Sequence, residues 1–251
     1  MYHKERLDTI LALVEERGYV TVKYLIENLH YSKATVNRDL NTLSQMGKLK
    51  RTWGGAEPVE VREIPLMWRY EYGKPIKKRI AKRACELVAD GDTLFIDGST
   101  TAQYMGEYLI EKKSIRVLTN NMALAAFLAE RGVYTTVLGG HVLEAPYMLA
   151  GPDTVEAAAK YRADKCFFSS RDVSESGEMS YADDIYYSMH RTMMRNSEQV
   201  IYLVDSEKIG RRGGRVVLGD FSLVDTVISD HSFTKQTKDR FPDVAFLKVE
   251  S

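Results

Sequence analysis

The stretch Asp97–Thr101, "DGSTT", carries groups that suit the binding of a phosphate. It follows the apolar run "TLFI", which is typical of a buried strand, and it leads into a predicted helix. Gly98 lets the backbone approach a ligand closely. The hydroxyls of Ser99, Thr100 and Thr101, with the amides of the helix N-terminus, can donate hydrogen bonds to phosphate oxygens. Because Ser/Thr clusters also cap helices in many proteins, this loop alone is weak evidence.

Three later loops also follow predicted strands. Asn120 and Asn121 come after "IRVLT" and open a helix, and Gly139-Gly140 end the run "VYTTVLGG". Lys208 lies in "VDSEK", at the end of the strand "QVIYLVD". In open α/β sheets, ligands collect outside the carboxyl ends of the strands. We therefore expect the four loops to line one ligand site.

A different group of polar residues lies in "YSKATVNRDLNTLSQMGKLKRTWGGA", near the N-terminus. Val36, Leu40 and Leu43 recur at helical spacing and are expected to face inward. Cations and short polar donors on the opposite face of such a helix suit base edges and phosphates in a major groove. The following "KLKRTWGG" predicts a basic hairpin that can contact the adjacent DNA backbone or minor groove. The predicted DNA-contacting residues are Ser32, Lys33, Thr35, Asn37, Arg38, Asn41, Lys50 and Arg51.

Three helices and a hairpin must position this face. Thr21 and Ser32 are good N-caps for the second and third helices. Residues 49–53 alternate like a strand, Gly54-Gly55 turns the chain, and a second short strand is expected to reach Val61. This order is typical of a winged helix-turn-helix domain over residues 1–60. From the pattern alone, an ordinary amphipathic helix with a solvated face remains the alternative to DNA binding.

The pattern changes after a predicted linker over residues 61–74. From Pro75 onward, helices alternate with strands, several of them continuously apolar. Such alternation indicates a mostly parallel sheet covered on both faces by helices. The predicted fold class is therefore α/β, with a winged helix-turn-helix domain followed by an α/β domain over residues 75–251.

Charge is distributed unevenly along the 251 residues. The whole chain has 35 Lys+Arg and 35 Asp+Glu, but residues 1–83 hold 17 and 10 of them. The split suggests a basic module that meets an anion and a second module that does not, unless the excess only solvates "KPIKKRIAKR". With no apolar run of roughly 18 residues and no apolar signal core at the N-terminus, we expect a cytoplasmic protein without a membrane partner.

The remaining reactive side chains predict neither a metal site nor a cofactor. Cys85 and Cys166 lie in apolar surroundings and are expected to be buried thiols rather than a disulfide. No metal-ligand spacing connects the five histidines, so we expect no zinc site. They are His3, His30, His141, His190 and His231.

Residues 4–57 resemble the N-terminal domain of the DeoR family of bacterial transcriptional regulators. Asn37 departs from the family, which usually has arginine there; Asn suits adenine, whereas Arg favours guanine or phosphate, so the operator is not carried over from relatives. Asp39 is expected to be structural, either pairing with Arg51 or capping locally. The family pattern is matched at Ser32, Thr35, Arg38, Asp39, Leu40, Leu43, Gly47, Leu49, Arg51, Gly54, Gly55 and Ala56.

Residues 75–235 resemble the sugar-phosphate sensor domain of the same family, whose fold is like ribose-5-phosphate isomerase and glucosamine-6-phosphate deaminase. The resemblance implies that Asp97–Thr101 surround the sugar phosphate. It also implies that Asn120, Asn121 and Lys208 line the rest of the site. The family's frequent "GADGI"-like loop is replaced here by "SSRDVSESG".

Arg171 lies in this altered loop, just past the apolar strand "KCFF". A guanidinium presents a planar, always-charged fork that matches a carboxylate or a phosphate. We therefore expect Arg171 to hold a second anionic group of the effector. The alternative is that it pairs with Asp172, Glu175 or a neighbouring subunit.

The residues and the resemblance predict a DNA-binding regulator, a repressor of a carbohydrate operon that leaves its operator when a phosphorylated sugar binds. Such DNA-binding helices usually work as dimers, so a homodimer or homotetramer is expected. One alternative is a sugar-phosphate isomerase or deaminase with an appended DNA-binding domain. That enzyme would need an acid/base pair, and "SSRD" supplies no evident partner for Asp97. Another is a constitutive DNA-binding protein whose second domain only dimerises.

Overall fold

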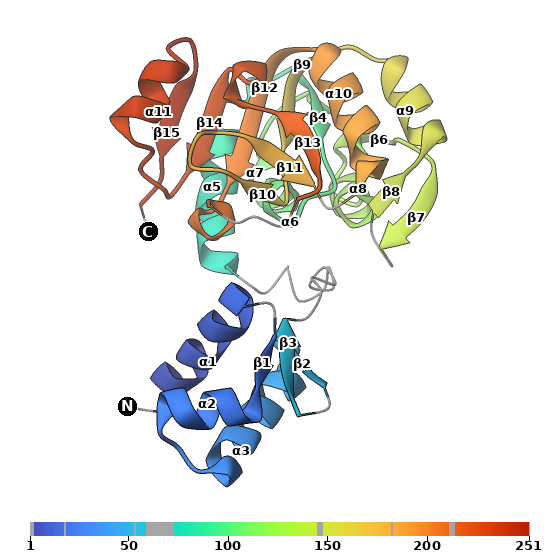
Figure 1. Cartoon of the computed structure of the whole chain (residues 1–251). Helices are drawn as coiled ribbons and strands as arrows, with labels where there is room; N and C mark the ends of the chain where they lie inside the picture. The colour runs from blue at the N-terminus through green and yellow to red at the C-terminus, as the bar shows by residue number, and fades with distance from the viewer. Residues whose placement is uncertain are drawn as a thin grey trace. The chain divides into compact units, whose positions relative to one another are not determined.

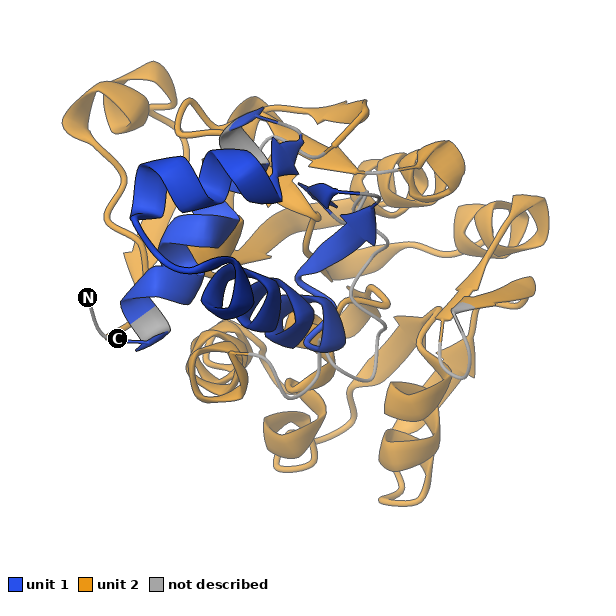
Figure 2. Cartoon of the chain, turned by 60° about the horizontal axis from the view of Figure 1, so that its bottom comes forward, with its two compact units in different colours: residues 1–64 blue, residues 65–251 orange. Residues whose placement is uncertain are grey.

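The computed structural model describes residues 3–17, 19–52, 54–58, 73–144, 148–181, 183–210 and 214–250. The chain divides into two compact units, residues 1–64 and 65–251, coloured separately in Figure 2. The predicted linker over residues 61–74 lies outside the described residues, apart from Gly73 and Lys74. The end of the predicted second hairpin strand, from residue 59 to Val61, also lies outside them.

Unit 1 is the winged helix-turn-helix that the sequence predicts (Figure 1). Thr21 Oγ1 accepts a hydrogen bond from Tyr24 N, and Ser32 Oγ accepts one from Thr35 N, so both predicted N-caps are confirmed. A short additional strand makes the sheet three-stranded and antiparallel, in the order β1-β3-β2. The elements are α1 (His3–Arg17), β1 (Val20–Thr21), α2 (Val22–Leu29), α3 (Lys33–Gln45), β2 (Leu49–Thr52) and β3 (Gly55–Pro58).

The core of unit 1 combines the apolar faces of its helices with side chains of its three strands. Val36 and Leu40 of α3 are fully buried, together with Ile10 of α1 and Leu25 of α2. Burying each such side chain contributes about 1.5–3 kcal/mol, so these contacts hold α3 with its polar face outward. At Gly55 an added Cβ would lie 2.2 Å from Val20 O, which explains why glycine occupies this close approach of β1 and β3.

Asp39 is structural, as predicted, but its expected partner was wrong. The carboxylate is 1% exposed and receives two hydrogen bonds from Arg6 of α1, from Nε at 2.5 Å and from Nη2 at 3.0 Å. Arg51 instead bonds to Asn37. The reason is helical geometry, since Asp39 lies on the side of α3 that packs against α1 and Asn37 lies on the side that faces β2. The ion pair fastens the predicted reading helix to α1.

Unit 2 is built on a seven-stranded sheet in the order β15-β14-β12-β9-β4-β5-β6, and all its pairings are parallel. This confirms the predicted parallel α/β sheet. The strands are β4 (Thr93–Ile96), β5 (Arg116–Thr119), β6 (Tyr134–Val137), β9 (Ala163–Phe168), β12 (Ser197–Val204), β14 (Thr226–Ser229) and β15 (Ala245–Lys248). The helices are α5 (Lys74–Cys85), α6 (Thr100–Gln103), α7 (Gly106–Leu109), α8 (Met122–Ala129), α9 (Pro152–Ala159), α10 (Tyr187–Arg195) and α11 (Lys235–Arg240).

The sheet is buried on both faces, which explains its continuously apolar strands. Phe95 of β4 joins a core with Met189 and Met193 of α10, whereas its neighbour Leu94 joins a second core with Ile80 of α5. Successive side chains of a strand point to opposite faces, so both faces need apolar residues when helices cover both.

Two small antiparallel sheets were not predicted. A hairpin of β7 (His141–Glu144) and β8 (Met148–Ala150) follows β6. A three-stranded sheet contains β10 (Asp172–Val173), β11 (Met179–Tyr181) and β13 (Val216–Gly219). These strands have two to four residues, too few for an alternating pattern to stand out. The described part of unit 2 also contains three short 3₁₀ helices: η1 (Asp184–Tyr186), η2 (Ser206–Lys208) and η3 (Phe221–Leu223).

Both cysteines are buried free thiols, as predicted. Burial raises the pKa of Cys85 to about 12, so this thiol stays protonated at neutral pH. Within the described ranges, none of the helices has the length and apolar character needed to cross a membrane.

Candidate functional site

The outer face of α3 presents the side chains that the sequence predicts for DNA contact. Lys33, Arg38 and Asn41 are exposed, and the inward-facing residues of the same helix are buried. Ser32 and Thr35 are already committed to the cap, with their hydroxyl oxygens 3.0 Å apart. The structure therefore leaves two cations and an amide displayed on one helix, which suits a groove lined by phosphates.

Asn37 is held by the chain itself. Its Oδ1 accepts a hydrogen bond from Arg51 Nη2 at 2.9 Å, and its Nδ2 donates to Lys33 O at 2.9 Å. These two bonds fix the orientation of the amide and leave one N–H and one lone pair of the oxygen for a contact to a base. In this arrangement Asn37 holds the guanidinium of Arg51, on β2, against the surface of α3. The contact spans 14 positions and depends on how the hairpin docks, so sequence spacing did not reveal it.

Lys50 lies on β2 opposite Glu57 of β3, with Nζ 2.9 Å from the carboxylate. The lysine side chain is 68% exposed, so this ion pair contributes only about 0–1 kcal/mol and can be exchanged for a contact to phosphate.

In unit 2, Asp97 follows β4 at the point where the strand order reverses. The chain runs from β4 outward to β5 and β6, then returns to β9 on the other side of β4. The carboxyl ends of strands at such a point form the usual ligand site of an open α/β sheet. Asp97 is 2% exposed; its Oδ1 accepts hydrogen bonds from Ser99 N and Oγ, and its Oδ2 accepts one from Ser169 N. It therefore joins the loops after β4 and β9.

Two buried polar atoms beside Asp97 are unsatisfied. Among the described residues, Thr101 Oγ1 and Asn120 Oδ1 have no hydrogen-bond partner, although both residues are 0% exposed. Leaving such a group unpaired costs about 1–3 kcal/mol, so its presence marks a place where a bound polar ligand can supply the partner. Ser99 caps α6 by accepting from Ala102 N at 3.2 Å, and Thr100 begins that helix.

Asn120 and Asn121 lie after β5, as predicted, and they use their amides differently. Asn120 Nδ2 donates to Leu149 O at 2.8 Å, which leaves its Oδ1 as the unsatisfied atom. Asn121 caps α8 by accepting from Leu124 N, and its Nδ2 donates to Gln103 Oε1. Asn121 therefore holds two helices in place beside the predicted site.

Gly98 and Gly140 are positions where β8 and α9 approach the loops closely. An added Cβ at Gly98 would lie 2.2 Å from Met148 Sδ. Gly140 has φ +119°, and its added Cβ would lie 2.2 Å from Thr154 Oγ1. Gly139 O accepts a hydrogen bond from the same hydroxyl at 2.5 Å. These glycines shape the loops through backbone packing.

Lys208 reaches toward Asp97 from the far side of β9. Its Nζ donates to Ser169 Oγ at 2.8 Å and to Ser170 O at 2.9 Å. The Arg171 guanidinium lies against Asp172, with Nε 3.3 Å from Oδ2, which is one of the pairings that the sequence left open. Lys208 therefore contacts the loop after β9, which also donates a hydrogen bond to Asp97. Arg171 pairs with Asp172.

His190 is the residue that sequence reasoning missed. It projects from α10, is 3% exposed, and places Nε2 3.1 Å from Asp97 Oδ2. The two residues are 93 positions apart, and no motif surrounds the histidine. Within the described part of the chain, no group of three or more His, Cys, Asp or Glu side chains is placed to hold a metal ion.

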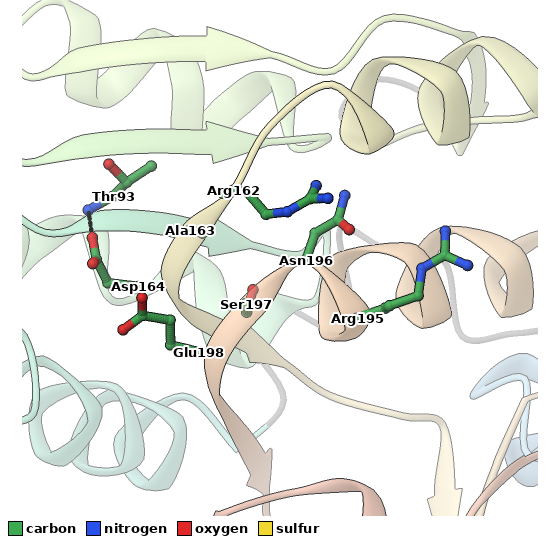
Figure 3. A pocket seen from close by; sticks show the side chains of 8 residues that line it. All are labelled: Thr93, Arg162, Ala163, Asp164, Arg195, Asn196, Ser197 and Glu198. Atoms are coloured by element: carbon green, nitrogen blue, oxygen red, sulfur yellow. Dashed lines mark hydrogen bonds between the residues drawn. The ribbon is translucent and has the colours of Figure 1, made fainter.

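A depression of about 330 Å³ lies at the opposite edge of the sheet, where β4, β9 and β12 begin (Figure 3). Arg162 and Arg195 occupy one side of it, and Asp164 and Glu198 the other. Asp164 accepts a hydrogen bond from Thr93 N at 2.7 Å, so this carboxylate helps to hold the sheet edge. None of the predicted site residues lines it.

Comparison with known proteins finds a matching domain for each of the two units. Residues 6–61 match the DeoR-like helix-turn-helix domain, and residues 74–231 match the DeoR C-terminal sensor domain. The chain is 30% identical to the glycerol-3-phosphate regulon repressor of Escherichia coli, over 92% of each protein. It is 31% identical to the lactose phosphotransferase system repressor of Streptococcus mutans, over 84% of this chain and 86% of that protein. It is 28% identical to the L-fucose operon activator of Haemophilus influenzae, over 90% and 92%.

Among solved structures, the chain is similar to ribose 5-phosphate isomerase A from Methanocaldococcus jannaschii, with 16% identity over 54% of each chain and a TM-score of 0.41. Similarities this distant bear on neither the ligand nor the activity. The two domain matches and the 30% identity over 92% of the chain are decisive. The chain belongs to the DeoR family of transcriptional regulators.

Proposed function

We propose that this regulator is a repressor of a carbohydrate operon, released from its operator when a phosphorylated sugar binds unit 2. The main support is the set of polar groups at the strand-order reversal, where Thr101 and Asn120 hold unsatisfied atoms beside the capped start of α6. Two relatives are named as repressors of glycerol-3-phosphate and lactose phosphotransferase genes. A third is named as an activator, so the sign of regulation needs its own test.

The proposal requires coupling between the two sites. If the sugar phosphate lowers operator affinity by some factor, the operator must lower sugar-phosphate affinity by the same factor. We propose a homodimer or homotetramer as the DNA-binding form, because helix-turn-helix proteins commonly read two half-sites with two copies.

A regulator without catalysis fits the surroundings of Asp97 better than an enzyme does. His190 is the second member of an acid/base pair that the sequence lacked, yet both of its ring nitrogens already face acceptors inside the protein. Asp97 likewise receives hydrogen bonds from Ser99 and Ser169. A general acid or base must reach the proton of its substrate, and both groups already have hydrogen-bond partners inside the protein. Conversion of a sugar phosphate to product by the purified protein would favour the enzyme instead.

The function is tested by a thermal-shift screen of sugar phosphates, followed by operator-release assays with each hit on DNA selected from a random pool. A ligand present at 100 times its Kd stabilises the folded protein by about 2.7 kcal/mol, which is readily visible as a raised melting temperature. We expect a hit to raise the melting temperature of unit 2 and to release the DNA. DNA binding that no stabilising sugar phosphate alters would contradict the proposed release and favour the constitutive alternative.

Replacing Arg38 by alanine is expected to weaken operator binding by about 1–3 kcal/mol, roughly a 5- to 150-fold loss, because this exposed cation lies on the outer face of α3. Fluorescence anisotropy with labelled operator at physiological salt measures the effect. Lys113→Ala is the matched control, since it removes the same charge from an exposed position of unit 2. Equal affinities of the Arg38→Ala variant and the wild type, with unit 1 folded, would rule out this contact.

Replacing Asn37 by arginine is expected to change base preference. The substitution removes the acceptor of Arg51 and sets two guanidiniums side by side, so Arg51 must move away from α3. Asn37→Ala separates the effects, since it releases Arg51 without adding a cation. Selection of bound sequences from random DNA measures the base preference. Identical selected sequences for wild type and Asn37→Arg would show that residue 37 does not influence which bases are read.

A further inference from the structure

His190 is fixed in place by four neighbours. Its Nδ1 lies 3.0 Å from Tyr186 O, and its Nε2 lies 3.1 Å from Asp97 Oδ2. The ring stacks on Tyr181, with centroids 5.1 Å apart and planes 5° apart, and Phe168 lies 5.6 Å away at a tilt. The imidazole is therefore clamped with both nitrogens directed at oxygens.

The hydrogen-bond partners of His190 determine how many protons the His190–Asp97 pair carries, and therefore its net charge. A carbonyl oxygen can only accept, so the Nδ1 that faces Tyr186 must carry a hydrogen. A bare Nε2 would then point its lone pair at a carboxylate oxygen, so a proton must lie between Nε2 and Asp97 Oδ2, whichever atom holds it. The pair as a whole is neutral, because this proton balances the charge of Asp97.

We propose that His190 is a positioning residue of the effector site, and that binding of an anionic effector depends on the proton it shares with Asp97. The inference rests on the proposed function, in which a sugar phosphate binds the loop Asp97–Thr101. Asp97 holds that loop directly, through hydrogen bonds of 3.1 and 2.6 Å from Ser99 N and Oγ. Loss of the proton leaves an unbalanced negative charge beneath a loop that must receive an anion, and like charges repel strongly where water is excluded.

Titratable groups from several other elements surround the pair. Burial raises the pKa of Cys166 on β9 and of Tyr181 on β11 well above their ordinary values, and it raises the pKa of Tyr202 on β12 as well. The Lys208 ammonium reaches Ser169, beside the pair. The nearby carboxylates are Asp172 and Asp205, and the charged residues of α10 and of the adjacent α9 are exposed: Arg191, Arg195, Asp153, Glu156 and Lys160.

The direction of the expected pH dependence follows from the charge of the His190–Asp97 pair. Effector affinity is full while the shared proton is present and falls as rising pH removes it. His190→Gln separates the two roles of the residue, since glutamine can still donate a hydrogen bond to Asp97 but cannot balance its charge. The variant should bind an anion more weakly at low pH and should lose the pH dependence.

The test measures the affinity of the full-length protein for sulfate between pH 6 and pH 8.5. Sulfate is chosen because its own charge stays constant over this range, unlike that of a sugar phosphate. We expect wild-type affinity to fall about tenfold across the range, corresponding to about 1.4 kcal/mol, and the affinity of His190→Gln to be weak and flat. His141→Gln is the matched control, a histidine exposed on β7, and it should keep the wild-type profile.

A purely structural role would weaken His190→Gln equally at every pH, so parallel profiles for variant and wild type overturn the inference. Nitrogen-15 spectra of the histidine rings give a second readout, with His190 assigned as the signal missing from the variant. A neutral ring with a bare Nε2 facing an ionised Asp97 at pH 6 would also overturn it. Failure of sulfate and of inorganic phosphate to bind any of the proteins contradicts the anion site itself, and with it the proposed function.

Discussion

Replacing Arg6 by methionine is expected to destabilise the DNA-binding unit strongly and to leave the stability of unit 2 unchanged. The carboxylate of Asp39 is 1% exposed, and Arg6 supplies both of its strong hydrogen bonds. Without the guanidinium, the carboxylate keeps only His3, 3.4 Å away on a side chain that is 60% exposed. Breaking a buried pair in this way costs about 3–5 kcal/mol. A unit of this size has a total stability of roughly 3–9 kcal/mol, so at least about a third of it is lost.

The two halves of this ion pair should not be equivalent. Arg6 is 13% exposed and can turn toward water when its partner is removed, so Asp39→Asn is expected to cost less than Arg6→Met. The hydrogen bond from Arg6 to Asp39 raises the pKa of the arginine, so the guanidinium stays charged at all ordinary pH values. Guanidinium titration followed by hydrogen exchange in residues 3–52 measures the stability of unit 1 separately from that of unit 2.

Lys23→Met is the matched control for Arg6→Met. Lys23 also faces a carboxylate, that of Glu27, but the atoms are 3.9 Å apart and the side chains are 85% and 59% exposed. Such a surface pair contributes at most about 1 kcal/mol. If Arg6→Met and Lys23→Met shift the unfolding midpoint of unit 1 by the same amount, the buried pair does not hold α1 to α3.

Replacing Thr100 by alanine together with Thr101 by valine is expected to abolish release by the effector and to leave operator affinity unchanged. Each hydroxyl that donates to a charged phosphate contributes about 1.5–3 kcal/mol, so the loss of two weakens effector binding about 100-fold or more. The operator contacts belong to the other unit and keep their residues. Operator release is measured against effector concentration with labelled DNA, using a sugar phosphate that stabilises the wild type.

The single substitution Thr101→Val is expected to change stability and effector affinity in opposite directions. The hydroxyl is buried without a partner among the described residues, so exchanging it for a methyl group removes an unsatisfied polar atom at constant shape. The variant without effector should melt at the same temperature as wild type or higher, while its effector affinity falls. Thr135→Val on β6 is the control, a partly buried threonine whose hydroxyl donates to Val133 O, and it should release DNA normally. Release of the double variant at the wild-type effector concentration refutes the role of this loop.

Local patterns in the sequence were enough to predict the three helices of unit 1, the caps of two of them and the polar face of α3. Ser32 caps α3 through a bond to Thr35 only three positions away, and Val36 and Leu40 recur at the period of a helix. Short-range interactions of this kind depend on neighbouring residues alone. The continuously apolar strands likewise predicted a sheet covered on both faces. The loops Asp97–Thr101 and Asn120–Asn121 could be placed at strand ends because each directly follows one of these apolar runs.

The partners of the charged and polar side chains were decided by tertiary structure. Asp39 meets Arg6 across 33 positions, Asn37 meets Arg51 across 14, and Asp97 meets His190 across 93. Each of these pairs forms because two elements with strong apolar faces pack together, and the packing then sets which polar groups are adjacent. Sequence patterns record burial and period, but they do not record strand order. Only the return of the chain from β6 to β9 placed Ser169 and Lys208 around Asp97, and only the packing of α10 on that sheet supplied its histidine.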